Sequence, residues 1–380
     1  MTTSLTNTVI SFGMPTRVEA RVLHQIRCLR PADRRGIQTT LSLSQPSVTR
    51  HVAALIDAGL VEEAPTRGTE SVGRPRKELR IDGRHLTVWG AHVGVRSSLL
   101  TVADAGGRIL RQRAVPANIR ESAAADFLPT IARELRELGD GLPSPVHTGV
   151  AFSAFVDARG HITSPEYQWE DVAATDILSG ELGRPMSAGV GVEALAGHEL
   201  AHNPIDDELE DSRLYFYARD VLSHAWVFHG QVHRPSSGRL PAFMSDNMVP
   251  ELAECATVGQ HPLSLTALIN ACQMRGFGVR GLPDICALTQ REPSIRDLMT
   301  RRAEALASII ATAVDVVDPH TIVLAGDTFA QDALTTKVVS QSLTRSNPQI
   351  RLRIPLRQST AASAVHAGLT PLWADPLSAV

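Results

Sequence analysis

The sequence predicts an α/β protein in which a small N-terminal segment of helices and one hairpin precedes a larger body of strands and helices. Three observations support this prediction. Apolar residues recur at helical spacing over residues 16–58, and two strand-like runs flank a glycine-containing turn over residues 60–81. Further along, residues 224–233 read as a strand pair and residues 301–317 as a long helix. With 380 residues, the chain is long enough for two or three domains, each with its own core.

The composition argues for a globular protein and against export or membrane insertion. Hydrophobic residues make up 43% and charged residues 20% of the chain, and no apolar run approaches the roughly 20 residues of a membrane-spanning helix. An export signal has positively charged residues before its apolar stretch, but no Lys or Arg precedes the short apolar stretch at the N-terminus of this chain. We therefore expect a cytoplasmic protein whose few, irregularly spaced cysteines are reduced thiols: Cys28, Cys255, Cys272 and Cys286.

The net charge of −3 conceals a basic head on an acidic body. Residues 1–84 contain 13 Lys and Arg against 8 Asp and Glu, or +5, and the remainder contains 24 against 32, or −8. A basic segment of this size can neutralise several DNA phosphates, and the acidic body would be repelled from them. Ordinary solvated surfaces also show such imbalances, so the local pattern has to decide between the two interpretations.

The third of three predicted N-terminal helices carries the strongest local signal. It follows a helix over residues 16–29 and a weaker one over residues 33–41. Ser44 is a suitable N-cap, a proline lies in the first turn, and Gly59 follows the last turn. The spacing predicts that three side chains of this helix face a core together: Val48, Val52 and Leu55.

The opposite face of this helix has the side chains that a DNA recognition helix needs. Short polar residues let a helix approach the major groove closely, and Gln and Arg can form paired hydrogen bonds with base edges. A plain surface helix whose polar face meets only water is the alternative. We predict that five residues face the major groove: Gln45, Ser47, Thr49, Arg50 and His51.

A predicted hairpin after this helix completes the pattern of a winged helix-turn-helix. Residues 60–63 and 77–81 read as its strands, and Gly73-Arg74-Pro75-Arg76-Lys77 precedes the second strand. Proline favours an extended backbone that keeps the two arginines apart, as suits the narrow minor groove. A solvated basic linker is the alternative interpretation of this segment. Because the segment follows the recognition helix, we expect contacts with the minor groove or phosphates by Arg74, Arg76 and Lys77.

These motifs, with a second domain that begins at Trp89-Gly90, resemble the ROK family of bacterial sugar-responsive repressors and sugar kinases. The resemblance implies a winged helix-turn-helix on a two-lobed, actin-like (ribonuclease H-like) body, and a dimer or tetramer. It implies three parts: a DNA-binding domain over residues 1–84, a small lobe over 85–200 with 366–380, and a large lobe over 201–365 that oligomerises.

The resemblance also implies that the kinase chemistry of the family has been lost. The run Gly90-Ala91-His92-Val93-Gly94 looks like the first phosphate motif, but His92 stands where the kinases have an Asp. Counting from Pro185, the Asn and the catalytic Asp of the kinases fall on Val190 and Gly191. Glycine has no side chain to orient a sugar hydroxyl, so a sugar kinase is the disfavoured alternative.

Sugar and zinc positions depart from the family pattern as well. The positions of the sugar-binding Glu and the zinc-binding His hold Ala242 and Ser245, only Cys255 lies near the missing zinc loop, and Asp327 replaces a glycine of the nucleotide loop. The resemblance therefore implies no enzyme activity, no cofactor and no metal. It leaves a small-molecule effector pocket near four residues: His92, Gly191, Glu193 and Ala242.

Two groups of histidines suggest rival metal sites. His198-Glu199-Leu200-Ala201-His202 matches the H-E-x-x-H pattern of zinc peptidases, but no third ligand follows at recognisable spacing, and the resemblance places the motif on a surface helix. Three further histidines on a predicted strand pair either form a metal or anion site or are satisfied individually by their neighbours: His224, His229 and His233.

Taken together, the sequence predicts a DNA-binding transcriptional regulator without membrane contact. We expect a repressor that binds a palindromic operator in double-stranded DNA as a dimer, and that responds to a sugar-like effector.

Overall fold

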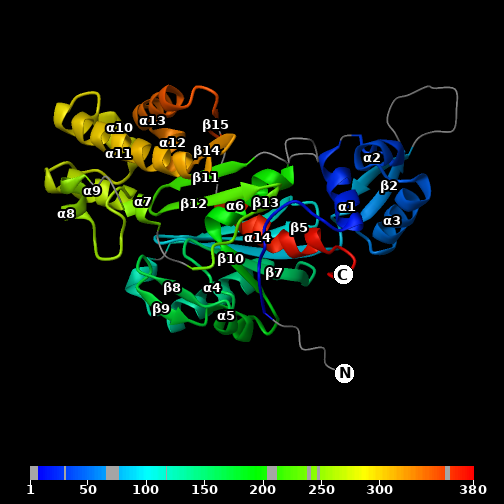
Figure 1. The fold of residues 1–380 in the computed structure, drawn as a ribbon. Helices are drawn as coiled ribbons and strands as arrows, with labels where there is room; N and C mark the ends of the chain where they lie inside the picture. Colours follow the sequence, from blue (N-terminus) through cyan, green and yellow to red (C-terminus); the bar gives the residue numbers. More distant parts are fainter. Residues whose placement is uncertain are drawn as a thin grey trace. The chain divides into compact units, whose positions relative to one another are not determined.

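The structure is a computed structural model that describes residues 7–29, 31–65, 77–116, 118–202, 212–237, 241–245, 249–355 and 360–380. The chain divides into two compact units (Figure 1). The first comprises Met1–Ile162, Val172–Leu209 and Thr360–Val380, and the second comprises Thr163–Asp171 and Glu210–Ser359. In the described part of the chain, no helix is long and apolar enough to cross a membrane.

Three helices and a hairpin form the N-terminal part of the first unit. Helices α1 (Val18–Cys28), α2 (Arg34–Leu41) and α3 (Gln45–Asp57) pack against one another and against the antiparallel strands β2 (Val61–Pro65) and β3 (Lys77–Ile81). The order and the bounds agree closely with the sequence prediction. Three helices followed by an antiparallel hairpin are the elements that the sequence analysis expects of a winged helix-turn-helix.

Local side chains define where these helices begin and end. The Asp33 carboxylate accepts a hydrogen bond from the Gly36 amide at 2.7 Å, and the Ser44 hydroxyl accepts one from the Ser47 amide at 3.4 Å. Each bond satisfies an amide at the start of a helix that has no partner within the helix. Ser42 ends α2 in the left-handed conformation with φ of 53°. The tight connection between α2 and α3 therefore follows from a few local contacts.

A six-stranded sheet forms the centre of the rest of the first unit. Its order is β1-β10-β7-β4-β5-β6; β5 is antiparallel to both its neighbours and the remaining pairs are parallel. The N-terminal edge strand was not predicted from the sequence. The strands are β1 (Thr8–Val9), β4 (Thr87–Val93), β5 (Ser98–Asp104), β6 (Ile109–Val115), β7 (Pro145–Phe152) and β10 (Ser187–Val190).

Helices cover both faces of this sheet (Figure 1). Helices α6 (Gly191–His202) and α14 (Thr360–Ala374) lie on one face, and α4 (Ala124–Gly139) and α5 (Ala174–Leu182) lie on the other. A Cβ atom at Gly90 or Gly149 would lie 2.0 Å from a backbone oxygen of α14, so these glycines let α14 rest directly on β4 and β7. The first unit also has the 3-10 helix Ile119–Glu121. Strands β8 (Ile162–Ser164) and β9 (Trp169–Val172) pair with each other, and their residues 163–171 belong to the second unit.

The second unit has a five-stranded sheet of order β13-β12-β11-β14-β15. The strands are β11 (Arg213–Ala218), β12 (Leu222–Phe228), β13 (Gln231–Val232), β14 (Thr321–Ala325) and β15 (Arg351–Arg353). The helices are α7 (Ala242–Ser245), α8 (Pro250–Cys255), α9 (Leu265–Met274), α10 (Leu282–Leu288), α11 (Pro293–Val317), α12 (Asp327–Gln331) and α13 (Ala333–Ser346). Leu306, Ile310 and Val314 of α11 are buried in its core, as their spacing predicts.

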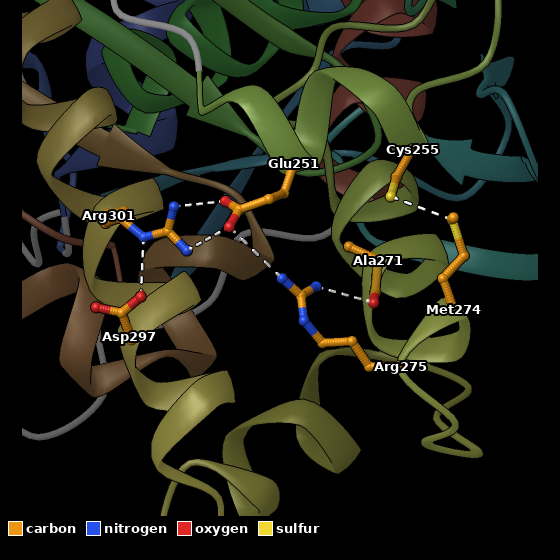
Figure 2. A network of polar contacts seen from close by, with 7 residues as sticks. All are labelled: Glu251, Cys255, Ala271, Met274, Arg275, Asp297 and Arg301. Carbon is orange, nitrogen blue, oxygen red and sulfur yellow. Dashed lines mark hydrogen bonds and ion pairs between the residues drawn. The ribbon is translucent and has the colours of Figure 1, made fainter.

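Ion pairs on the surface of this unit join α8, α11 and the end of α9 (Figure 2). Both oxygens of Glu251 bond the Arg301 guanidinium, which also pairs with Asp297 at 2.9 Å. Arg275 lies 3.9 Å from Glu251, and the Cys255 thiol lies 3.4 Å from the Met274 sulfur. The hydrogen bonds from Arg301 are the main reason that the pKa of Glu251 is lowered.

We expect the variant Glu251→Gln to lower the free energy of unfolding by only about 0.5–1 kcal/mol, because exposed ion pairs are screened by water. Urea unfolding of both proteins in low and high salt would measure the difference. A loss of several kcal/mol that persists in high salt would contradict the assignment of this network to the solvated surface.

Candidate nucleic-acid interface

The predicted recognition residues lie on the solvent side of α3. Gln45, Thr49 and Arg50 are exposed, and Ser47 and His51 are half-buried. On the opposite side, Val48, Val52 and Leu55 are at most 1% exposed and pack in the core of the three helices. The helix therefore divides into a buried face and a polar face, as its sequence pattern predicts.

Local contacts restrain part of this polar face. The Thr49 hydroxyl donates to the Gln45 carbonyl at 2.9 Å, and the His51 Nδ1 lies 4.0 Å from the Glu19 carboxylate of α1. The Arg50 guanidinium reaches the His51 ring at 3.4 Å and is otherwise open to solvent. Arg50 is thus an exposed cation on a helix whose backbone is fixed by the core beneath it.

Of the basic residues predicted to contact DNA from the wing, Lys77 lies within the described part of the chain. Arg74 and Arg76 lie outside the described residues. Lys77 is exposed, but its ammonium group bonds Glu63, which also pairs with Arg34 at 2.6 Å. The hydrogen bonds from Lys77 and Arg34 lower the pKa of Glu63, so this carboxylate stays ionised and neutralises part of the nearby positive charge. The sequence did not reveal this pairing because the three residues come from three different elements.

An arginine that the sequence analysis did not single out fixes α1 to the rest of the unit. The Arg27 guanidinium lies over the Trp373 ring of α14, 3.1 Å from its centroid, and donates to the Ala201 carbonyl at the end of α6 at 3.2 Å. Arg17, the residue before α1, pairs with Asp375 at 2.8 Å. The core of the three helices continues through these contacts into α14. Because α1 also packs on α3, the orientation of α3 is tied to the body sheet.

Two of the predicted effector-pocket residues contact each other in the first unit. His92 is buried, and its two ring nitrogens lie 3.0 Å from the Ser363 hydroxyl and 3.1 Å from the Ser153 hydroxyl. A Cβ atom at Gly191 would lie 2.9 Å from the His92 ring, so a larger residue at position 191 requires His92 to move. The site thus has an imidazole between two serine hydroxyls.

The other predicted residues of the body lie farther along the chain. Glu193 is buried on α6. Ala242 and Ser245 are the first and last residues of α7 in the second unit. Asp327 begins α12 and pairs with Arg219 at 2.9 Å, so its carboxylate occupies the end of the loop that follows β14.

The H-E-x-x-H motif lies on α6, but its histidines are not arranged as zinc ligands. The His202 Nδ1 lies 2.7 Å from the carbonyl oxygen of His198, and the two rings are 4.0 Å apart. Burial lowers the pKa of His198 to about 3, and the Arg27 cation adds to this effect. Across the described ranges, no three His, Cys, Asp or Glu side chains are grouped as a metal site requires.

Two of the three histidines near β12, His224 and His233, pack against aromatic neighbours. His224 packs edge-on against Trp226 and Phe243, at 6.0 and 5.5 Å between ring centroids, and burial lowers the pKa of His224 to about 4. His233 packs against Phe228 at 6.3 Å, and His229 lies in the turn before β13 with φ of 50°. The structure therefore favours individual packing for these residues.

Comparison with known proteins finds curated relatives and solved structures that are similar to this chain. No family model matches it. It is 27% identical to the proteins named transcriptional regulator Rv0485 of Mycobacterium tuberculosis and transcriptional regulator Mb0495 of Mycobacterium bovis, over 97% of this chain and 89% of each relative. A solved ROK family transcriptional regulator, a homolog of the Escherichia coli Mlc protein, matches 94% of this chain and 98% of its own at a TM-score of 0.71 and 16% identity. The chain therefore shares the fold of this solved protein.

Sugar kinases with the ROK fold match a smaller share of the chain. The ROK hexokinase from Thermus thermophilus covers 75% of it at a TM-score of 0.56 and 22% identity. The predicted α/β fold and the resemblance to ROK regulators are therefore confirmed. The solved regulator thus covers a larger share of this chain than the hexokinase does.

Proposed function

We propose that this chain is a DNA-binding transcriptional regulator that reads the major groove with α3. The observation that carries this proposal is the exposed polar face of α3, with Arg50 free to reach a base edge or a phosphate. The winged arrangement of the surrounding helices and hairpin supports it, as does the excess of +5 charges in residues 1–84. The names of the curated relatives agree with it.

In this proposal, residues 1–84 are the DNA-binding domain and the body sets its geometry. The lobes that we assign to residues 85–200 with 366–380 and to 201–365 would hold two copies of the chain together in the cytoplasm. A homodimer would then place two recognition helices on a palindromic operator, with half-sites one or two turns of double-stranded DNA apart. The expected mode of regulation is repression, by occupancy of a promoter.

A sugar kinase is the second candidate, because proteins with the same body fold carry that activity. Gly191 argues against it, since no carboxylate stands where the reaction needs a base, and His92 is held by two serine hydroxyls. The same hydroxyls and imidazole suit hydrogen bonds with a polyol. We therefore retain a sugar-like effector near His92, Gly191 and Glu193, with Ala242 as a contributor from the second unit.

The proposal is tested with Arg50→Ala in the full chain. DNA fragments are first selected by the wild-type protein from a random double-stranded library, and affinity is then measured by fluorescence anisotropy at several salt concentrations. We expect the variant to bind the selected site at least tenfold more weakly, in line with the value of about 1–3 kcal/mol for one base contact. The variant Lys77→Ala should weaken binding by less than about threefold, because Glu63 already neutralises this lysine.

A matched control removes an arginine from the body. Arg136 is exposed on α4, and the variant Arg136→Ala should keep the wild-type affinity and salt dependence. If the Arg50 and Arg136 variants bound the selected DNA equally well, α3 would not be the recognition helix. If the wild-type protein selected no DNA, the proposed function itself would be wrong.

A further inference from the structure

Residues 7–14, which we call the clamp, lead from the edge of the body sheet toward α1. The clamp begins with β1, whose Thr8 pairs in parallel with Ser187 of β10; the two hydroxyl oxygens lie 2.6 Å apart. The Asn7 side chain adds three hydrogen bonds at this end, with the Met186 amide, Asp176 and Ser179. The start of the clamp is therefore tied to the body by a few polar contacts that are exposed or partly buried.

Phe12 anchors the other end of the clamp in a notch formed by two glycines. A Cβ atom at Gly189 of β10 would lie 2.7 Å from the Phe12 ring, and one at Gly197 of α6 would lie 2.8 Å from the Phe12 Cβ atom. The ring stacks on His366 of α14, with 5.5 Å between the centroids, and Phe12 is 1% exposed. The notch therefore accommodates the phenyl ring because both glycines lack a side chain.

The clamp ends next to the DNA-binding helices. Three residues separate Met14 from Val18, the first residue of α1, so the connection spans at most about 14 Å. Arg27 fixes the far end of α1 to α6 and α14, as described above, and the clamp restrains its beginning. Because α1 packs on α3, a seated clamp also restrains α3.

The apolar side chains of the clamp do not contribute to the DNA-reading face. Ile10 and Phe12 are almost completely buried, so neither can contact DNA. They can still affect DNA binding, because a helix whose orientation is fixed beforehand loses less conformational freedom when it binds. Loss of the clamp would let the start of α1 move on the body, and this freedom would have to be given up again on DNA.

We propose that Phe12 is a positioning residue for DNA binding. By seating the clamp in its notch, Phe12 holds α1, and with it α3, in the orientation that binds DNA. The part of this proposal that concerns DNA affinity rests on the proposed function, and the part that concerns the hold on α1 does not.

The hold on α1 is tested by hydrogen–deuterium exchange of the full wild-type chain and of Phe12→Ala. We expect the amides of residues 18–28 to exchange at least fivefold faster in the variant, and those of α11 in the second unit to keep their rate. Unchanged exchange in α1 would overturn the proposal. If circular dichroism shows that Phe12→Ala has not folded, Asn7→Ala replaces it in every measurement, because it removes only the polar contacts at the start of the clamp.

The effect on DNA is tested by the anisotropy titration described above, with a second buried phenylalanine as the matched control. We expect Phe12→Ala to bind the selected site at least fivefold more weakly than the wild-type protein. Phe127 is 3% exposed on α4, on the opposite face of the sheet, and Phe127→Ala should keep the affinity within twofold. Equal losses in both variants, or no loss in Phe12→Ala, would overturn the positioning role.

A reversible lock separates the position of the clamp from the packing of its ring. Thr8→Cys with Ser187→Cys places two thiols where the hydroxyl oxygens now lie 2.6 Å apart. In the Phe12→Ala background, the oxidised protein should bind the selected DNA at least threefold more tightly than the same protein reduced with dithiothreitol, and the wild-type protein should not respond to either treatment. Equal affinities of the two forms, with the disulfide verified by mass spectrometry, would overturn the proposal. Failure of the wild-type protein to select DNA would overturn the proposed function and leave the exchange result intact.

Discussion

Substitution of Gly149 by alanine is expected to unfold much of the first unit. A Cβ atom at this position would lie 2.0 Å from the Ala367 carbonyl oxygen and 2.4 Å from its carbon. Both atoms belong to the backbone of α14, so no side chain can rotate to make room. Separating α14 from β7 would open the centre of the core, and we expect a loss of at least about 4 kcal/mol in the free energy of unfolding. That is a large share of the roughly 5–15 kcal/mol that stabilises a typical protein.

Urea unfolding followed by circular dichroism measures this loss, and Gly180→Ala is the matched control. Gly180 is an exposed glycine inside α5, and a Cβ atom there would meet nothing within 4 Å. Alanine is a better helix former than glycine, so this variant should be unchanged or more stable by about 0.5–1 kcal/mol. Equal stability of the two variants would show that α14 does not rest on β7 as described.

Acidification below pH 6.5 is expected to destabilise the protein by several kcal/mol before its carboxylates are protonated. Burial lowers the pKa of His366 well below its usual value, that of His198 to about 3, and that of His147 and His224 to about 4. These groups are neutral in both states above pH 6.5. Below that pH the unfolded chain takes up protons that the folded chain cannot, so stability falls as the pH approaches each folded pKa. If folding lowers the pKa of one group by two, that group can remove about 3 kcal/mol from the free energy of unfolding once the pH falls below both pKa values.

The measurement is urea unfolding at pH 7, 6 and 5, compared between the wild-type protein and His366→Leu. His366 stacks on Phe12 and faces the rings of His198 and Trp373. The Arg27 cation lies near its imidazole, and neither ring nitrogen of His366 has a hydrogen-bond partner. Leucine keeps an apolar side chain there and cannot titrate, so the variant should lose less stability between pH 7 and 5. A wild-type stability that does not change over this range, or an equal pH dependence in the variant, would contradict burial of these imidazoles in the neutral form.

Local patterns were enough to predict the helices and the hairpin of the N-terminal part. Ser44, Val48 and Val52 lie within one or two helical turns of each other, so capping and burial could be inferred from spacing alone. That position 191 has no side chain was also visible in the sequence.

The interactions that couple these elements could not be predicted from spacing. Arg27 meets Ala201 and Trp373 only because α6 and α14 converge on α1, and each of these partners lies more than a hundred residues away in the chain. The N-terminal strand β1 joins a sheet edge formed by β10, for the same reason. The sequence by itself determined the local elements of the N-terminal part. Only the tertiary structure decided which charges are matched, because pairing over long sequence separations depends on how the elements pack.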